Sequence, residues 1–342
     1  MANIRQVAKQ AGVSVATVSR VLNHPEAVSI KTKEKVLAVM EEMNYTPNGI
    51  ARSLALNRTS TIALLIPNIL NPLYPQVAKG IEDVAHQKGY NLLLCNTEED
   101  EEKEKEYIEM LLEKRVDGFI LISSFLERQD IDKIKNRNTS IVMIGSCKEN
   151  IDVDIVYTDY LKGAYQATQH LIDLGYKRIA HISGPLKGME SREKLMGYER
   201  ALKEIEINTS EDYIVEGDNE IEGGYLAAKQ LLQLEKPPKA IFAANDLMAI
   251  GAIDAIKDSG LKIPDDIAIV GFDNIRMSAL VEPKLTTISQ PVYKMGLIAA
   301  RLLVDNIENG DEEEFKQRIF LQPKLKVRKS CGHEDRIREI FN

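Results

Sequence analysis

From residue 61 almost to its end, the chain alternates short runs of β-branched and aliphatic residues with longer segments of helical periodicity. The runs that predict strands are TIALLIP, YNLLLCN, GFILIS, SIVMIGS, RIAHISG, YIVEGD, AIFAAND and IAIVGFD. Most are separated by segments that predict amphipathic helices, at residues 75–88, 100–114, 161–174, 191–205, 221–234 and 247–259. This alternation indicates parallel sheets covered by helices on both faces, because each connection must cross back over its sheet.

The number of predicted strands bears on how many sheets the chain builds. Eight or more strands across roughly 280 residues are more than a single hydrophobic core usually serves. We therefore expect an α/β core of two doubly wound parallel-sheet lobes. A last predicted helix, YKMGLIAARLLVDNI, and the run QRIFLQPKLKVRKS close the chain.

Residues 3–57 have a different pattern, which predicts helices only. Gly12 permits a tight turn after IRQVAKQA, and Ser14 can cap the following helix, VATVSRVL. A third helix is predicted in KTKEKVLAVMEEM, and Pro47 interrupts it. The side chains that we expect to face the interior of this small all-α unit are Ile4, Val7, Ala8, Ala11, Val18, Val21, Leu22, Val36, Leu37, Met40 and Met43.

Charge is distributed unevenly along the chain. The formal net charge is −8, yet residues 1–60 carry eight basic and four acidic side chains, or +4, which leaves −12 for the rest. A basic module on an acidic body is typical of proteins whose small module binds the phosphates of nucleic acid. Charge alone favours the simpler alternative, a solvated face of mixed sign, so the motifs must decide between the two.

Other features bear on the class and compartment of the protein. Cys95, Cys147 and Cys331 are odd in number and far apart, which predicts reduced thiols rather than disulfides or a metal site. No apolar run approaches the length of a membrane span, and MANIRQVAKQ has no apolar signal core. We therefore expect a cytoplasmic protein with no membrane partner. Five scattered histidines, without a GxSxG, HExxH or P-loop motif, predict that the chain is not an enzyme.

Several motifs occur together in one order: IRQVAKQAGVSVATVSRVLN, YTPNGIARSLALNRTSTIALLIPNILNPLY, HLIDLGYKRIAHISGP, AIFAANDLMAIGAIDA, and IAIVGFDN with LTTISQP. On these motifs the chain, over about residues 3–330, resembles the lactose-repressor/purine-repressor family of bacterial transcription regulators. The resemblance implies a helix-turn-helix DNA-binding headpiece at residues 1–46 and a hinge helix with linker at 47–60. It further implies a dimer whose core, at residues 61–330, is similar to the periplasmic sugar-binding proteins.

The family's two lobes exchange chain segments. The resemblance therefore implies a first lobe of about residues 61–160 plus 291–320 and a second of about 161–290 plus 321–330. Residues 331–342 run past the resemblance, and we interpret them as a surface extension. Cys331 and His333 are too few ligands for a metal site, and we expect no cofactor.

In a helix-turn-helix, the early outward residues of the second helix reach base edges in the major groove. Arg20 can pair with the N7 and O6 atoms of guanine, whereas Val15 and Ala16 can only touch thymine methyl groups. The alternative is a core helix whose polar residues face water. The residues that we predict to contact DNA are Ser14, Val15, Ala16, Thr17, Ser19, Arg20, Asn23, Arg52 and Leu54.

The segment NGIARSLA also has two interpretations. It can be a linker whose Leu54 packs against the body of the protein. The resemblance implies instead a hinge helix that enters the minor groove, where the matching leucine wedges between base pairs and bends the DNA. Because a helix of two turns is marginal in isolation, this hinge would order only when both copies meet on DNA.

The resemblance places an effector between the lobes, at loops that follow the carboxyl ends of strands. Asp273 and Asn245 would bond hydroxyl groups and Tyr74 would offer a stacking face, although a polar residue after a strand can also serve only as a helix cap. The residues predicted for this site are Leu73, Tyr74, Ser123, Lys194, Asn219, Asn245, Asp273 and Gln290.

Three positions depart from the family's pattern. Lys194 stands where sugar- and purine-responsive relatives usually have arginine, and Arg192, two residues away, points to a different helix face. Asn219 replaces an aromatic residue, and Gly145 replaces an aspartate. The site thus lacks part of the usual charged clamp and stacking platform. This favours either an unusual ligand, such as a sugar phosphate or an oligosaccharide, or weak control by small molecules.

A lysine at position 194 is also similar to the family's carbon-catabolite control type, which a phosphorylated phosphocarrier protein governs by docking on the first lobe. Tyr293, Met295 and Arg301 in VYKMGLIAARLL resemble its partner-binding helix. The same helix could instead pack in the dimer interface.

These observations predict a repressor that binds a palindromic operator in double-stranded DNA as a homodimer and responds to a sugar or sugar phosphate. One alternative is the same regulator governed by a protein corepressor. Another is a sugar-binding module without DNA function, which would carry a secretion signal and lack the basic helical head.

Overall fold

The computed structural model describes residues 3–23, 27–45, 58–146, 151–207, 210–310 and 316–332. It divides into two compact units, residues 1–59 and residues 60–342. Each unit has hydrophobic clusters of its own, so each can be described by itself. Arg52 and Leu54, predicted to contact DNA, lie outside the described residues.

Within its described residues, the first unit contains three helices, α1 (Ile4–Ala11), α2 (Val15–Asn23) and α3 (Ile30–Glu42). Gly12 ends α1 with φ of 63°, a left-handed conformation that suits glycine, and thereby turns the chain into α2. The expected interior is confirmed at Val7, Ala8, Ala11, Val18, Val21, Val36 and Met40, which are all buried. Leu37 was predicted to face inward, and this is wrong: it is 43% exposed, because Val39 instead completes the buried stripe of α3.

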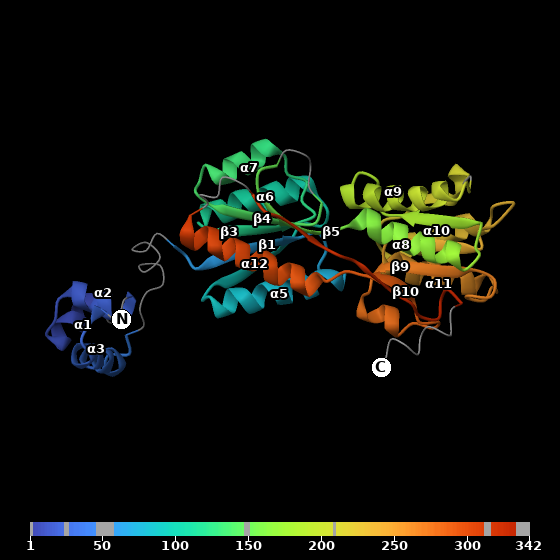
Figure 1. Cartoon of the computed structure of the whole chain (residues 1–342). Coiled ribbons are helices and arrows are strands. Elements are labelled where there is room, and N and C mark those ends of the chain that lie inside the picture. Colours follow the sequence, from blue (N-terminus) through green and yellow to red (C-terminus); the bar gives the residue numbers. More distant parts are fainter. Residues whose placement is uncertain are drawn as a thin grey trace. The chain divides into compact units, whose positions relative to one another are not determined.

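The second unit begins with a sheet of six strands in the order β11-β5-β4-β3-β1-β2, with every neighbouring pair parallel. Helices α5 and α12 cover one face and α6 and α7 the other (Figure 1). We call this sheet and its helices the first lobe. Its elements are β1 (Thr61–Ile66), α5 (Leu73–Gln87), β2 (Asn91–Asn96), α6 (Glu101–Glu113), β3 (Gly118–Ile122), α7 (Arg128–Lys135), β4 (Ser140–Ile144), β5 (Asp154–Thr158), α12 (Val292–Asn309) and β11 (Arg318–Leu321).

A second sheet has the order β12-β10-β9-β8-β6-β7 and is parallel except for the antiparallel edge strand β12. Helices α8 and α9 pack on one face and α10 and α11 on the other, which forms the second lobe. Its elements are α8 (Tyr160–Asp173), β6 (Ile179–Ser183), α9 (Met189–Glu204), β7 (Ile214–Glu216), α10 (Ile221–Leu232), β8 (Ala240–Ala243), α11 (Asp246–Asp258), β9 (Ala268–Asp273), β10 (Thr286–Ser289) and β12 (Lys324–Lys326). Two short 3₁₀ turns, Glu211–Tyr213 and Arg276–Ala279, complete it.

The predicted fold class of two doubly wound lobes after a helical headpiece is confirmed, and all eight predicted strands are present. Four further strands, β5, β10, β11 and β12, were not predicted. Strand β10 is TTIS, whose Thr286 and Thr287 are fully buried although threonine carries a polar hydroxyl group. Hydrophobicity patterns do not predict such a strand, because the burial of threonine depends on the hydrogen bonds of its hydroxyl group.

Helices α10 and α11 approach closely enough that backbone meets backbone, and so do α5 and α12. In the α10–α11 pair, a Cβ on Gly224 would lie 2.2 Å from the Met248 carbonyl oxygen, and one on Gly251 would lie 1.8 Å from that of Ile221. Gly296 on α12 meets the Val77 carbonyl of α5 in the same way, at 2.3 Å. In Figure 1, α12, from near the end of the chain, accordingly lies beside α5. Glycine is required at these crossings because no side chain fits.

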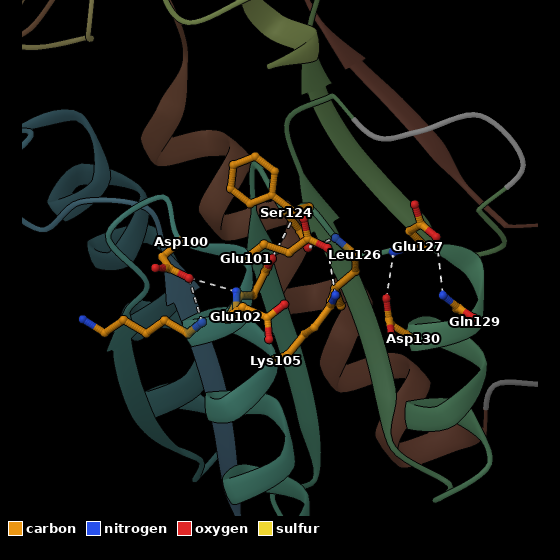
Figure 2. A network of polar contacts seen from close by, with 12 residues as sticks. Asp100, Glu101, Glu102, Lys105, Ser124, Leu126, Glu127, Gln129 and Asp130 are labelled. Atoms are coloured by element: carbon orange, nitrogen blue, oxygen red, sulfur yellow. Dashed lines mark hydrogen bonds and ion pairs between the residues drawn. The ribbon is translucent and has the colours of Figure 1, made fainter. Parts of the chain in front are cut away.

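The loop that follows β3 lies beside the capped starts of α6 and α7 (Figure 2). The Glu104 carboxylate of α6 accepts a hydrogen bond from Phe125 N–H of this loop at 3.0 Å. Asp100 caps α6 by accepting hydrogen bonds from the backbone N–H groups of Glu102 and Lys103, at 2.9 and 3.0 Å. The Ser124 hydroxyl oxygen accepts from Leu126 N–H at 3.2 Å, and the Asp130 carboxylate from Glu127 N–H at 3.2 Å. This network fixes the backbone next to Ser123.

Cys331 was assigned to a surface extension, and for this residue the assignment is wrong. Its side chain is 1% exposed in the second lobe, where Sγ lies 3.2 Å from His170 Nε2 and 3.1 Å from Thr286 Oγ1. The hydrophobic core therefore extends past residue 330, where the sequence motifs end.

Candidate functional site

The headpiece presents one face of α2 to solvent. Ser14 begins this helix, and its hydroxyl oxygen accepts a hydrogen bond from Thr17 N–H at 3.0 Å. Val18 and Val21 are buried, whereas Val15 is 41% exposed and Ala16 and Arg20 are also exposed. Because side chains three and four residues apart share a helix face, Ala16 and Arg20 lie together on the outer face. This arrangement leaves a guanidinium and small apolar groups free to meet base edges.

Thr17 and Ser19 are half-buried at the sides of this face. Asn23 is the last residue of α2, and its side chain lies outside the described part of the chain, as do Arg52 and Leu54 of the hinge. Lys31 and Lys35 on α3 are exposed and add positive charge to the same unit.

In the second unit, strand order locates a second candidate site. In the first sheet, the chain adds β2 on one side of β1 and then β3 on the other side, so the direction of strand order reverses between β1 and β3. In the second sheet, it reverses in the same way between β6 and β8. In open α/β sheets, the loops at the carboxyl ends of strands diverge at such a point and leave a crevice that takes ligands. The loops after β1, β3, β6 and β8 are therefore where binding residues are expected.

Polar contacts join these loops across the two lobes. The Ser123 hydroxyl donates to Glu190 Oε1 at 2.7 Å, and the Asn68 amide donates to Glu220 Oε1 at 2.7 Å. Ser146 donates to Glu193 Oε2 at 3.0 Å. We call the group formed by Tyr74, Ser123, Tyr160, Glu190, Lys194, Asn219, Asn245, Asp273 and Gln290 the interlobe site.

Asp273 ends β9 with φ of 110°, a conformation that L-residues rarely adopt. Its carboxylate accepts a hydrogen bond from the Gln290 amide at 2.7 Å, and both side chains are buried. Burial raises the pKa of Asp273 from 3.8 to about 6, against the opposing effect of the Lys194 ammonium. Strain and desolvation at a residue on a strand end are typical of binding sites.

Lys194 is buried, and its charge is satisfied within the second lobe. The ammonium donates to the Ala244 carbonyl oxygen at 2.9 Å. It also lies 4.4 Å from the centroid of the Phe272 ring and 5.3 Å from that of Tyr160, where the aromatic faces attract a cation. Arg192 is exposed and donates to the backbone carbonyls of Leu186 and Lys187, so the expectation that it points elsewhere is confirmed.

The two tyrosines of the interlobe site have carboxylates as neighbours. Burial raises the pKa of Tyr74 well above its ordinary value, and the charges of Glu190, Glu99 and Asp273 raise it further. Burial also raises the pKa of Tyr160, whose hydroxyl bonds the Glu190 carboxylate. Both phenols therefore stay protonated and can donate hydrogen bonds.

Hydrogen bonds within the second lobe connect several of the predicted effector residues. Asn245 caps α11 by accepting from Met248 N–H at 2.7 Å, and its amide donates to the Asn219 carbonyl oxygen at 2.9 Å. Asn245 therefore has the capping role that its position after a strand allowed. Leu73, like its neighbour Tyr74, is partly buried and packs against the hydrophobic core of the first lobe.

Glu190 is the residue that sequence reasoning missed. It lies in the first turn of α9, directly after the loop that follows β6, and one carboxylate oxygen lies 2.5 Å from where a Cβ on Gly145 would stand. The carboxylate therefore occupies the space next to Gly145, the position where the resemblance led us to expect an aspartate. An acidic residue in the first turn of a helix at a switch point was the signal that could have revealed it.

Of the three residues predicted to face a protein partner, Met295 does not. It is 2% exposed, and its sulfur accepts a hydrogen bond from the Thr158 hydroxyl at 3.4 Å, because it lies on the side of α12 that packs on the sheet. Tyr293 is 44% exposed and donates to Asp83 at 2.8 Å, and Arg301 is exposed.

Within the described ranges, no group of three or more histidine, cysteine, aspartate or glutamate side chains is placed to hold a metal ion. A search of the same residues finds no helix with the length and apolarity needed to cross a membrane.

Comparison with known proteins gives two matches, one for each of the two compact units. Residues 3–48 match the family model described as bacterial regulatory proteins, lacI family. Residues 59–328 match the model described as periplasmic binding proteins and sugar binding domain of the LacI family.

Two curated relatives are similar over most of their length. The HTH-type transcriptional repressor PurR of Aliivibrio salmonicida is 39% identical over 332 residues, 96% of this chain and 99% of the relative. The catabolite control protein A of Priestia megaterium is 40% identical over 301 residues, 88% and 91% of the two chains. Among solved structures, the lac repressor dimer bound to operator and the anti-inducer ONPF aligns with a TM-score of 0.85 at 30% identity, covering 96% of this chain and 99% of that one.

Proposed function

The chain belongs to the LacI family of bacterial regulatory proteins, and from that membership we propose how its own residues divide the work of a DNA-binding transcriptional repressor. Two copies bind a palindromic operator, each placing α2 in a major groove. A sugar-like effector binds at the interlobe site and changes the affinity for operator. The family consists of transcriptional regulators, and repression, not catalysis, is the activity proposed here.

The observation that carries the DNA-binding role is the outer face of α2. Arg20 is exposed on a helix whose opposite side is buried, and Ser14 anchors the start of that helix through Thr17. A bidentate contact from arginine to guanine is worth about 1–3 kcal/mol of discrimination between bases. Val15 and Ala16 add selection by shape and methyl contact.

The test replaces Arg20 with alanine in the full-length protein. The Arg20→Ala variant should lose preference for operator over scrambled DNA by about tenfold or more, while weak, salt-sensitive binding persists. Fluorescence anisotropy with both duplexes measures this ratio. Lys31→Ala, which removes one exposed charge on α3, is the control and should weaken both complexes alike. Wild-type selectivity in Arg20→Ala would refute the assignment.

The effector role rests on the interlobe site. Asp273, Gln290 and Asn245 provide fixed acceptors and donors, and Tyr74 and Tyr160 provide protonated phenols. Such a set suits the many hydroxyl groups of a sugar, and the matching family model is described as sugar binding. Operator binding measured with and without each sugar that stabilises the protein would show whether the ligand releases or tightens the complex.

A protein corepressor is a second candidate, favoured by the similarity to catabolite control protein A and by the exposure of Tyr293 and Arg301 on α12. The burial of Met295 removes one of the three residues on which this interpretation rested. An Arg301→Ala variant that abolished corepressor-dependent binding to operator, with sugar response intact, would favour it.

A further inference from the structure

Carboxylates gather around the interlobe site from both lobes. Glu190 and Asp273 face Tyr74 and Tyr160, and Glu99 and Glu220 also act on Tyr74. They come from four segments: α9, the end of β9, the turn after β2, and the start of α10. Two of them are held by amides, Glu220 by Asn68 at 2.7 Å and Glu99 by Asn219 at 3.5 Å.

The nearest cation does not offset these charges for an incoming anion. Lys194 is 7% exposed, and its ammonium is engaged by the Ala244 carbonyl and by the rings of Phe272 and Tyr160. A phosphate group would need donors that point at it, and the exposed guanidinium of Arg192 is turned to backbone carbonyls. The exposed Lys187 also acts on Glu99. Because four carboxylates outnumber Lys187 and Lys194, the charge that faces a ligand among the described residues is predominantly negative.

Glu190 has the most contacts in this group. It accepts from Ser123 of the first lobe and from Tyr160 of the second, and it lies against Gly145, where any side chain would collide with its carboxylate. Glycine at position 145 leaves room for the Glu190 carboxylate, and its φ of 98° is a conformation that favours glycine.

We propose that Glu190 is the specificity-determining carboxylate of this site, and that the effector is a sugar that bears hydroxyl groups but no phosphate or carboxylate group. This inference rests on the proposed function, since it concerns the same site, and it excludes the sugar phosphates that the sequence alone allowed.

The negative charge of the carboxylates explains both the binding of hydroxyl groups and the rejection of anions. Ionised carboxylates only accept hydrogen bonds, so they bind the O–H groups of a polyol well. An anion placed among them in a site screened from water meets like charges at short range and gains no compensating donor. Ser123 donates to Glu190 in the structure, so a sugar hydroxyl that reaches this carboxylate takes the place of, or joins, that contact between the lobes.

The experiment is isothermal titration calorimetry of the full-length protein with matched pairs: glucose and glucose 6-phosphate, ribose and ribose 5-phosphate, fructose and fructose 1-phosphate, and glucose and glucuronate, with cellobiose added as an uncharged disaccharide. The tightest ligand should be uncharged, and its charged counterpart, where the panel holds one, should bind at least tenfold more weakly. In Glu190→Gln this ratio should fall at least threefold, because the amide keeps the shape and loses the charge. Glu199→Gln, on an exposed part of the same helix, should keep the wild-type ratio.

A second variant separates charge from the contact between lobes. Ser123→Ala removes the hydroxyl that donates to Glu190 but leaves the carboxylate, so discrimination against the anion should persist even if overall affinity changes. A charged member that binds as tightly as its neutral partner overturns the inference and leaves the proposed function standing. A ratio unchanged in Glu190→Gln overturns the role of Glu190. If no sugar of either kind binds the wild-type protein, control by a sugar fails and the inference fails with it.

Discussion

His181, in the middle of β6, shows how completely one polar side chain can be enclosed in this protein. It is fully buried between the rings of Tyr198 and Phe242, with centroids 5.1 and 4.8 Å away. Its Nδ1 bonds the Phe242 carbonyl oxygen at 2.9 Å, while Nε2 has no hydrogen-bond partner among the described residues. Burial lowers the pKa of His181 from 6.5 to about 4, so the ring is neutral at pH 7.

This burial makes the stability of the second unit depend on pH. As pH falls below 6.5, the histidine of the unfolded chain takes up a proton before the folded one does, which favours unfolding. The contribution is complete above pH 6.5 and is lost between pH 6.5 and about 4, in total about 3 kcal/mol. Urea unfolding of His181→Phe, which keeps an aromatic ring in the stack, should show a loss smaller by about that amount. Equal profiles for His181→Phe and wild type would contradict this account.

At the scale of elements, the sequence predicted the helices and strands that local sequence patterns specify. It missed those that depend on contacts with distant parts of the chain. Except for the two-turn helix α7, the helices of both units follow from periodicity and caps such as Ser14 and Asp100, and so do the eight hydrophobic strands. Strand β5 is short, and the polar side chains of β10 are buried against Arg328 and Ser330, which come much later in the chain. Similarly, most effector residues could be inferred from motifs, but the place of Glu190 beside Gly145 depends on how the two lobes meet.

The crossing of α10 and α11 gives a prediction at this scale. A methyl group on Gly224 would overlap the backbone of Met248, whereas one on the adjacent Gly223 would meet only the side chain of Asp218, which can move. Gly224→Ala should therefore destabilise the protein by about 2 kcal/mol or more, despite the better helix propensity of alanine. Gly223→Ala is the matched control in the same helix and should be close to neutral. Thermal unfolding of both proteins measures the difference, and equal melting temperatures would show that the helices separate readily.

The whole molecule consists of two units that each enclose their own hydrophobic clusters. Residues 1–59 hold the cluster of α1, α2 and α3, and residues 60–342 hold the four clusters of the lobes. Net basic charge belongs to the first unit and net acidic charge to the second. Binding to DNA and binding to effector are thus assigned to parts with separate cores.

Removal of residues 1–59 tests this division. The remaining chain should unfold cooperatively and bind the same sugars with unchanged affinity, because no residue of the interlobe site is lost. Its retention on heparin should fall sharply, since the basic module is gone. Circular dichroism, calorimetry and heparin chromatography follow the three properties. Undiminished retention would place nucleic-acid binding on the second unit.

The interleaving of the lobes has a consequence for synthesis of the protein. The chain leaves the first lobe after β5, returns for α12 and β11, and ends in the second lobe with β12. On the ribosome, neither sheet can receive its last edge strand until residues 318–326 have emerged, although the headpiece is complete some 270 residues earlier. A nascent chain therefore carries a complete headpiece long before the two lobes that bind the effector are complete. A premature stop before residue 318 would leave that module attached to two incomplete lobes at once.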